Sequence, residues 1–150
     1  MSVFKKLISE LAELSGLPLE IDNKNSCSLE SDSLIITLQY RKANNDIVIF
    51  APVTDPDRYS NINESVLRKA LELSFNGTGT EGNYLGLFNN DLILSSVINL
   101  RELTAEKLAE CIFAFKQNAS FVRESLASAY EEFPQEEDTE RPLENLSLSV

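Results

Sequence analysis

Apolar residues at the start of the chain recur every three or four positions, the spacing of an amphipathic helix. The pattern predicts a first helix over residues 2–15, ended by Gly16. Beyond it the period falls to two, because Leu19 and Ile21 alternate with acidic residues, and this predicts a short, half-buried strand. A polar linker that contains Cys27 follows. The apolar stripe of the first helix consists of Phe4, Leu7, Ile8, Leu11 and Leu14.

Two longer strands are predicted after the linker. "SLIITLQYR" places apolar side chains on one face, whereas "DIVIFAPV", residues 46–53, is apolar on both faces and therefore more central. The "KANND" between them predicts a hairpin loop. After a polar loop, Asn61 and Glu64 are spaced as a capping box for a second helix, "NINESVLRKALELSF".

The rest of the chain predicts two strands and a long helix. The strands span about residues 83–88 and 91–99, and the helix begins after Thr104, its expected N-cap, with Leu103 and Leu108 as a hydrophobic staple. Phe113 and Phe121 point off the apolar stripe of this helix, to different sides. The stripe itself consists of Leu108, Cys111, Ile112, Phe115, Ala119, Val122 and Leu126.

The predicted order is helix, three strands, helix, two strands, helix. Tight hairpins require a largely antiparallel sheet, so the fold class is α+β. Residues 1–130 form the predicted domain. Residues 131–150 hold seven acids and one base, a net charge of −6, which predicts an acidic, solvated tail in preference to a binding segment.

A cofactor site is suggested by one motif only. Gly77, Gly79 and Gly82 spell the G-x-G-x-x-G of dinucleotide-binding turns. In those turns a strand enters the glycines and a helix leaves them, because the pyrophosphate sits on the helix N-terminus. Here the order is inverted, so the glycines are interpreted as a link between helix and strand, with Gly77 just past the helix C-terminus. No cofactor is expected.

Charge and composition narrow the chemistry further. A net charge of −11 argues against nucleic acid as a partner. The apolar stretches are too short for membrane insertion, and the N-terminus has no secretory leader, so a cytoplasmic protein is expected. The chain has no histidine, no recognisable nucleophile motif and only two separated cysteines, which predicts neither a catalytic centre nor a metal site. A calcium loop at Asp55 and Asp57 is rejected, because Ser60 and Val66 stand where glycine and glutamate are required.

One structural question stays open in the sequence. A sheet flanked by helices on one side leaves its other face uncovered, and the strands "DIVIFAPV" and "DLILSSVINL" carry apolar residues on both faces. Helices of the same chain could cover both faces. Alternatively, this surface meets a second copy, or an extended peptide adds a strand to the sheet edge.

The whole pattern resembles the class I chaperones of bacterial type III secretion, the Tir-chaperone type that escorts effector proteins. The resemblance covers about residues 1–130. It rests on the first helix running into "LSGLPLEID", on "LELSFN" with the glycine loop and "YLGLFNNDLILSSVINL", and on the closing helix "LTAEKLAECIFAFKQNASFVRESL".

This resemblance implies a homodimer without enzymatic activity that binds the N-terminal part of an effector as an extended chain. It also implies the secretion ATPase as a further candidate partner. The first helix and nearby strands would bind cargo, and the second helix with the strand after the glycines would form the dimer contact. The candidate cargo-binding residues are Phe4, Leu7, Leu11, Leu19, Ile21, Leu34 and Ile36, and the candidate dimer residues are Leu67, Leu71, Phe75, Leu85 and Leu87.

Two alternatives remain beside this hypothesis. A protein of the same fold could sequester another secretion component as a regulator. A small enzyme would instead use carboxylates or the glycine loop, and would show saturable nucleotide binding that is lost in Gly79→Val.

Overall fold

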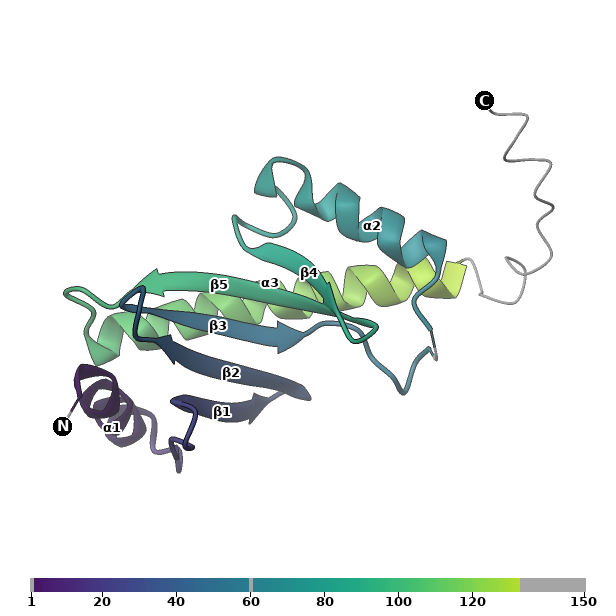
Figure 1. Cartoon of the computed structure of the whole chain (residues 1–150). Coiled ribbons are helices and arrows are strands. Elements are labelled where there is room, and N and C mark those ends of the chain that lie inside the picture. The colour runs from purple at the N-terminus through teal and green to yellow at the C-terminus, as the bar shows by residue number, and fades with distance from the viewer. Residues whose placement is uncertain (1, 60, 133–150) are drawn as a thin grey trace.

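The computed structural model describes residues 2–59 and 61–132, which form three helices and five strands (Figure 1). A single 3-10 turn, Phe75–Gly77, follows the second helix. The elements, in chain order, are α1 Val3–Ser15, β1 Ser26–Ser31, β2 Leu34–Arg41, β3 Asp46–Pro52, α2 Glu64–Ser74, β4 Tyr84–Phe88, β5 Asp91–Asn99 and α3 Ala105–Glu132. The predicted order of elements and the α+β class are confirmed.

The strands form one antiparallel sheet in the order β1-β2-β3-β5-β4. Strand β3 lies at its centre, as its two apolar faces predict, and β1 and β4 are the edges. Helix α3 runs behind the sheet in the view of Figure 1, α1 lies near the start of α3, and α2 lies beyond β4. Within the described part of the chain no helix covers the opposite face, where Ile35 and Val97 are exposed.

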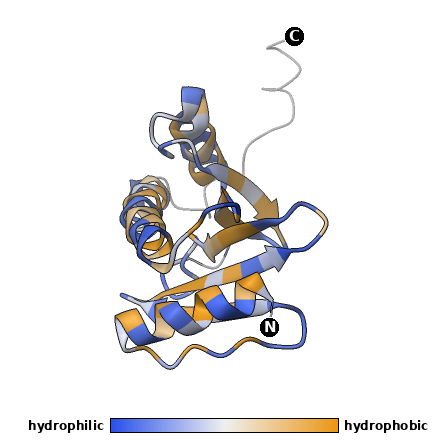
Figure 2. Cartoon of the chain, turned by 90° about the vertical axis from the view of Figure 1, so that its left-hand side faces the viewer, coloured by the Kyte–Doolittle hydropathy of each residue, from blue (hydrophilic) through white to orange (hydrophobic). Residues whose placement is uncertain are grey.

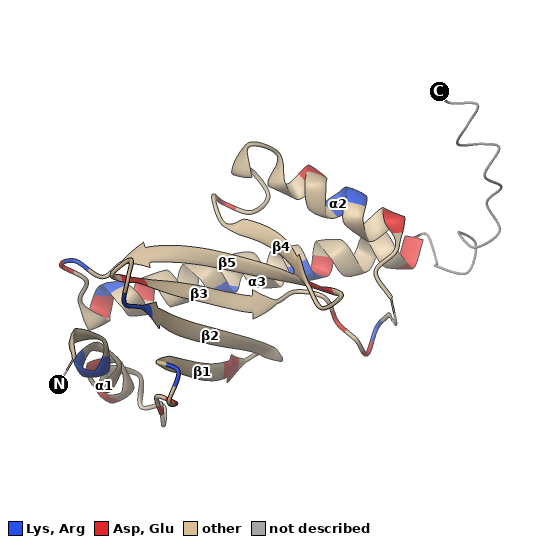
Figure 3. Ribbon diagram, in the orientation of Figure 1, with Lys and Arg blue, Asp and Glu red and all other residues tan. Residues whose placement is uncertain are grey.

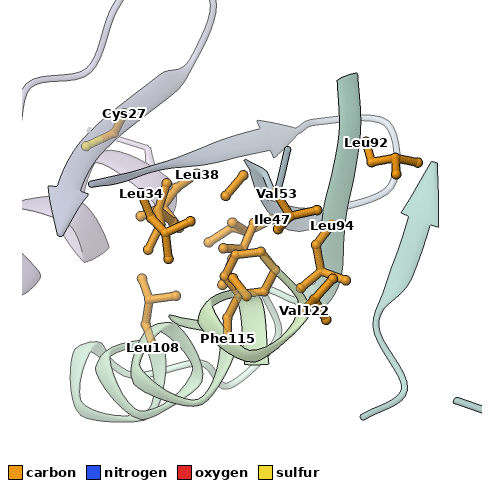
Figure 4. Close-up of a cluster of buried hydrophobic side chains, with 14 of the residues drawn as sticks. Cys27, Leu34, Leu38, Ile47, Val53, Leu92, Leu94, Leu108, Phe115 and Val122 are labelled. Carbon is orange, nitrogen blue, oxygen red and sulfur yellow. The ribbon is translucent and has the colours of Figure 1, made fainter. Parts of the chain in front are cut away.

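The core lies between α3 and the sheet. Side chains at alternate positions of β2, β3 and β5 point toward α3 (Figure 4), since successive residues of a strand face opposite sides. Figure 2 shows apolar and polar residues in turn along α1, where the buried residues recur every three or four positions. Each large aliphatic side chain fully buried here contributes roughly 1.5–3 kcal/mol. The centre of this core consists of Leu34, Leu38, Ile47, Val53, Leu94, Leu108, Phe115 and Val122.

The first strand is not where the sequence predicts it. The segment around Leu19 and Ile21 forms no strand, and β1 lies in the predicted polar linker. Its register with β2 explains the error, because Cys27 pairs with Leu38 and both are buried. Only two residues of β1, Cys27 and Leu29, are apolar and face inward, and the rest are serines and Glu30. The strand is therefore recognisable only once β2 provides a partner.

The helix ends follow local rules, with one correction. Asn63, not Asn61, caps α2: its side-chain oxygen accepts a hydrogen bond from the backbone N–H of Val66 at 3.0 Å. The helix begins at Glu64, so the capping residue is the one directly before it. The predicted N-cap of α3 is confirmed, since Thr104 Oγ1 accepts from Lys107 N at 3.1 Å.

The last helix ends two residues after position 130, where the sequence predicts the end of the domain. Helix α3 continues to Glu132. In its last turn the exposed carboxylate of Glu131 pairs with Arg58. Residues 133–150, which hold the rest of the predicted acidic tail, lie outside the described residues.

An ion pair closes the hairpin between β2 and β3. Arg41 donates to both carboxylate oxygens of Asp46, at 2.8 and 2.7 Å, and Asp46 is buried. The hydrogen bond from Arg41 holds the pKa of Asp46 below its ordinary value. Because the pKa is lower in the folded chain, the stabilisation is present above the unfolded value of about 3.9 and is lost as pH falls through the folded pKa.

We therefore expect acid to weaken the wild-type protein more than Asp46→Asn. The unfolding midpoint in urea, measured from about pH 6 down to about pH 2, should differ most between the two at neutral pH. The difference should shrink as the pH falls below the ordinary carboxyl range. A difference that keeps its size across this range would contradict the assignment.

Candidate functional site: an apolar groove beside an edge strand

An apolar cavity of about 180 Å³ lies between the end of α1, the edge strand β1 and α3. We call it the α1–β1 groove. Its walls come from segments far apart in sequence, which the packing of α1 against α3 brings together. The residues that line it are Leu11, Ser15, Leu17, Leu19, Leu29, Ser31, Ile36, Ala109, Ile112, Phe113 and Lys116.

The end of α1 shapes one wall of the groove. Gly16 adopts the left-handed conformation, with φ 73°, and its N–H donates to the carbonyl of Ala12 at 2.9 Å. This conformation favours glycine and turns the chain sharply out of the helix. Leu17 and Leu19 then pass beside β1, and Leu17 is exposed.

The groove runs beside an unpaired sheet edge. Strand β1 has β2 on one side only, and the preceding segment reaches only its start, where Asp22 N donates to the carbonyl of Ser26 at 2.8 Å. An edge strand offers backbone donors and acceptors to any added strand. Leu29 and Ser31 from the later part of β1 line the groove, so an added strand would lie next to the apolar cavity.

Helix α3 contributes an exposed aromatic to the same groove. Phe113 is 62% exposed although it is a large apolar residue, and Ile112 beside it is partly buried. Lys116 stands one turn further along and pairs with Asp32 at 2.9 Å. The groove is thus an apolar hollow with a charged pair near its rim.

The predicted cargo-binding residues fall into three groups. Leu11, Leu19 and Ile36 line the groove, and Ile21 is partly buried against the core. The others, Phe4, Leu7 and Leu34, are buried in the core with at most 5% of their surface exposed. Sequence reasoning missed Leu17, Leu29 and Ile112 as lining residues. For Phe113 a signal did exist, because it points off the apolar stripe of its helix.

A second apolar surface covers α2 and β4. Leu67, Leu71 and Phe75 recur every four residues, so they share one helix face, and Leu71 is 75% exposed. The opposite face of α2 is buried through Val66, Ala70 and Leu73, which leaves the exposed stripe without a partner in the described chain.

The edge strand β4 continues this surface. Leu87 is exposed and Leu85 is half-buried, so four of the five predicted dimer residues lie open to solvent. Tyr84 and Phe88 on the same strand are exposed as well. We call the set of Leu67, Leu71, Phe75, Leu85 and Leu87 the α2–β4 surface; Tyr84 and Phe88 lie on the opposite face of β4. Contiguous exposed apolar patches on soluble proteins mark interaction sites.

Charged residues are rare on the sheet. They gather on helices and loops, and the central parts of β2, β3, β4 and β5 carry almost none (Figure 3). The ion pairs between Arg123 and Asp55, at 3.0 Å, and between Arg58 and Glu124 instead fix the loop after β3 to α3. The chemistry left on the sheet and its edges is therefore apolar contact and backbone pairing.

The glycine motif has a structural role. The glycines follow a helix and precede a strand, as expected. Helix α2 ends at Ser74, earlier than predicted, and Asn76 and Gly77 both take left-handed conformations after it. Gly79 lies against Leu73, so close that a Cβ there would come within 2.9 Å of the Leu73 Cα. The motif joins helix to strand, and no helix leaves it to hold a phosphate.

The described residues hold no group of three or more acidic, cysteine or histidine side chains that could bind a metal ion. Cys27 and Cys111 are free thiols, and burial raises the pKa of both. A raised pKa disfavours the reactive thiolate. Among the described helices, none is long and apolar enough to cross a membrane.

Comparison with known proteins agrees with these features. Residues 6–123 match the model of the Tir chaperone protein (CesT) family, which is most of the chain. The chain therefore belongs to this family, whose members are chaperones and not enzymes, and the expected class, an effector-binding chaperone of type III secretion, is confirmed. None of the curated proteins matches the sequence.

Solved structures share the fold. A chain of the ExsC–ExsE complex superimposes with a TM-score of 0.69 at 24% identity, covering 84% of this chain and 97% of that one. The HopA1–SchA chaperone–effector complex gives 0.64 at 19% identity, covering 81% and 94%. The Yersinia pestis type III secretion chaperone SycH, in complex with a stable fragment of YscM2, gives 0.59 at 17% identity, covering 79% and 98%.

Proposed function

We propose that the protein acts in the cytoplasm as a homodimer that holds the N-terminal segment of a secreted effector in extended form. The observation that carries this proposal is the α1–β1 groove beside the free edge of β1. An extended peptide could pair its backbone with β1 while its alternate side chains enter the apolar cavity. No bond is made or broken, and the protein needs neither cofactor nor catalytic residue for this activity.

The energetics favour a dimer for this task. A segment held extended loses conformational entropy, so only a large contact area retains it. Two grooves on one dimer would double that area and could hold one cargo chain at two places. The α2–β4 surface supports such a dimer, because its apolar residues are exposed in the single chain and lie apart from the groove.

The function is tested by identifying the partner. The tagged protein, expressed in its native host, should co-purify with a secreted protein, and limited proteolysis should leave only an N-terminal segment of that partner protected. Light scattering of the purified complex should give two copies of the chaperone for each partner. Capture of a folded, globular domain, or of no protein, would contradict the proposal.

A single substitution in the groove should weaken cargo binding. Phe113→Asp places a charge at an exposed position that lines the groove, so we expect the captured effector segment to bind at least about tenfold more weakly. The measurement is titration calorimetry with the protease-protected segment. Leu7 is unsuitable for this test, because it is buried and Leu7→Asp would destabilise the whole fold.

Phe121→Asp is the matched control. Phe121 lies on the same helix, is similarly exposed at 54%, and does not line the groove. It should bind the segment as the wild-type protein does. Equal loss of affinity in both variants would show that general surface charge, and not the groove, decides binding.

A further inference from the structure

We propose that the C-terminal segment of this chain, residues 143–150, occupies the α1–β1 groove when no partner is bound. The segment would lie as an added strand beside β1, with its apolar side chains in the cavity. Its meaning as a built-in competitor of cargo and its preference for β1 over β4 rest on the proposed function, whereas the pattern of the segment and the reach of its linker do not.

The sequence of this segment has the pattern that the groove requires. In "LENLSLSV" the apolar residues Leu146, Leu148 and Val150 alternate with serines, the period of a strand with one apolar face. Six of the seven acids of residues 131–150 precede Leu143, so the chain changes there from charged to apolar. Charged residues disfavour burial, so within residues 133–150 the last eight are the ones suited to an apolar site.

The linker is long enough to reach the groove. Phe113 lies 19 residues before Glu132 on α3, which corresponds to about 28 Å at the helical rise. Residues 133–142 span up to about 33 Å when extended. Leu143 can therefore arrive beside Phe113 and Lys116 with little slack.

A hollow on the surface lies between the helix end and the groove. It has a volume of about 300 Å³, and its walls include Arg58, Ser120 and Arg123. The carboxylate of Glu131 pairs with Arg58, which places the end of α3 at this hollow. Asp32 connects this hollow to the groove, because it lines the hollow and pairs with Lys116 at the rim of the groove.

The groove suits this segment better than the other sheet edge does. Strand β4 belongs to the α2–β4 surface, which a second copy covers in the proposed dimer. The edge of β1 stays free in that dimer and has the cavity beside it. A tether of this length gives an effective concentration of about 1 mM, so even weak intrinsic affinity keeps the segment bound while a tighter cargo displaces it.

Amide hydrogen exchange of the full-length protein tests the proposal without any effector. In the variant Leu146→Ser with Leu148→Ser, the amides of Ser28 and Glu30, which point away from β2, should exchange about tenfold faster than in the wild-type protein, since the strand that protects them is released. The matched control changes the alternate positions, Ser147→Asn with Ser149→Asn, and should exchange as the wild type does. Unchanged exchange in the leucine variant would overturn the proposal.

A cross-link decides whether the segment binds its own chain. Cysteines at Ser15→Cys, in the groove, and at Val150→Cys, one of the apolar positions that face the cavity, are introduced after Cys27→Ala and Cys111→Ala remove the native thiols. Mild oxidation should give a disulfide within one chain, seen as a faster monomer band on a non-reducing gel. A covalent dimer would show that the segment enters the groove of a second copy, and no cross-link would show that it does not reach the groove; either result overturns the proposal. Both assays lack cargo, so their failure would leave the proposed effector binding untouched.

Discussion

Leu71→Asp combined with Phe75→Asp is expected to convert the proposed dimer into monomers. The two side chains are 75% and 69% exposed in the single chain, so the substitutions should leave the fold of each chain intact. In a symmetric dimer each substitution occurs twice, and four carboxylates would enter one apolar interface. Burying unpaired charge costs several kcal/mol, so we expect the dimer to weaken by at least about 100-fold.

Analytical ultracentrifugation over a range of concentrations measures this effect, and circular dichroism checks the fold. The matched control is Val3→Asp with Phe121→Asp, which also adds two charges at exposed apolar positions but lies off the α2–β4 surface. The control should remain a dimer. A wild-type protein that sediments as a monomer would refute the proposed dimer, and a dimeric Leu71 and Phe75 variant would move the interface elsewhere.

Gly79→Ala is expected to destabilise the fold by about 2 kcal/mol, the range found for overpacking. Its Cβ would lie 2.6 Å from the Leu73 Cδ2 and 2.9 Å from the Leu73 Cα, and backbone cannot move aside as a flexible side chain can. The loop would have to shift away from α2. That shift strains two hydrogen bonds of 2.9 Å, from Gly79 N to the carbonyl of Leu73 and from Asn118 Nδ2 to the carbonyl of Gly79.

Gly86→Ala is the matched control, since nothing lies within 4 Å of its added Cβ. A thermal melt should show a fall of about 6 °C for Gly79→Ala and almost none for Gly86→Ala. Adding ATP or a nicotinamide dinucleotide should shift neither melt, because the glycines are explained by packing. Equal stability of the two variants would contradict this role, and stabilisation by a nucleotide would support the enzyme alternative.

The sequence separates exposed from buried residues better on α2 than on α1. Helix α2 carries two apolar stripes, and only the one with Val66, Ala70 and Leu73 is buried, so Leu67 and Leu71 are exposed, while their role in a dimer contact stays a prediction. On α1 the sequence offers no such distinction. In α1 a single stripe holds both Phe4, which is buried, and Leu11, which is buried yet lines the groove, so core and docking residues follow the same period.

By itself the sequence determined the helices, their caps at Thr104 and Gly16, the hairpin between β2 and β3, and the structural meaning of the glycines. These features depend on residues close together in the chain, where helical period, capping and turn chemistry act directly. Tertiary structure alone decided that Ser26–Ser31 is a strand and that Leu17, Leu29 and Phe113 share one groove. The physical reason is that an edge strand and a groove are made by partners distant in sequence, and exposure is settled only when those partners have packed.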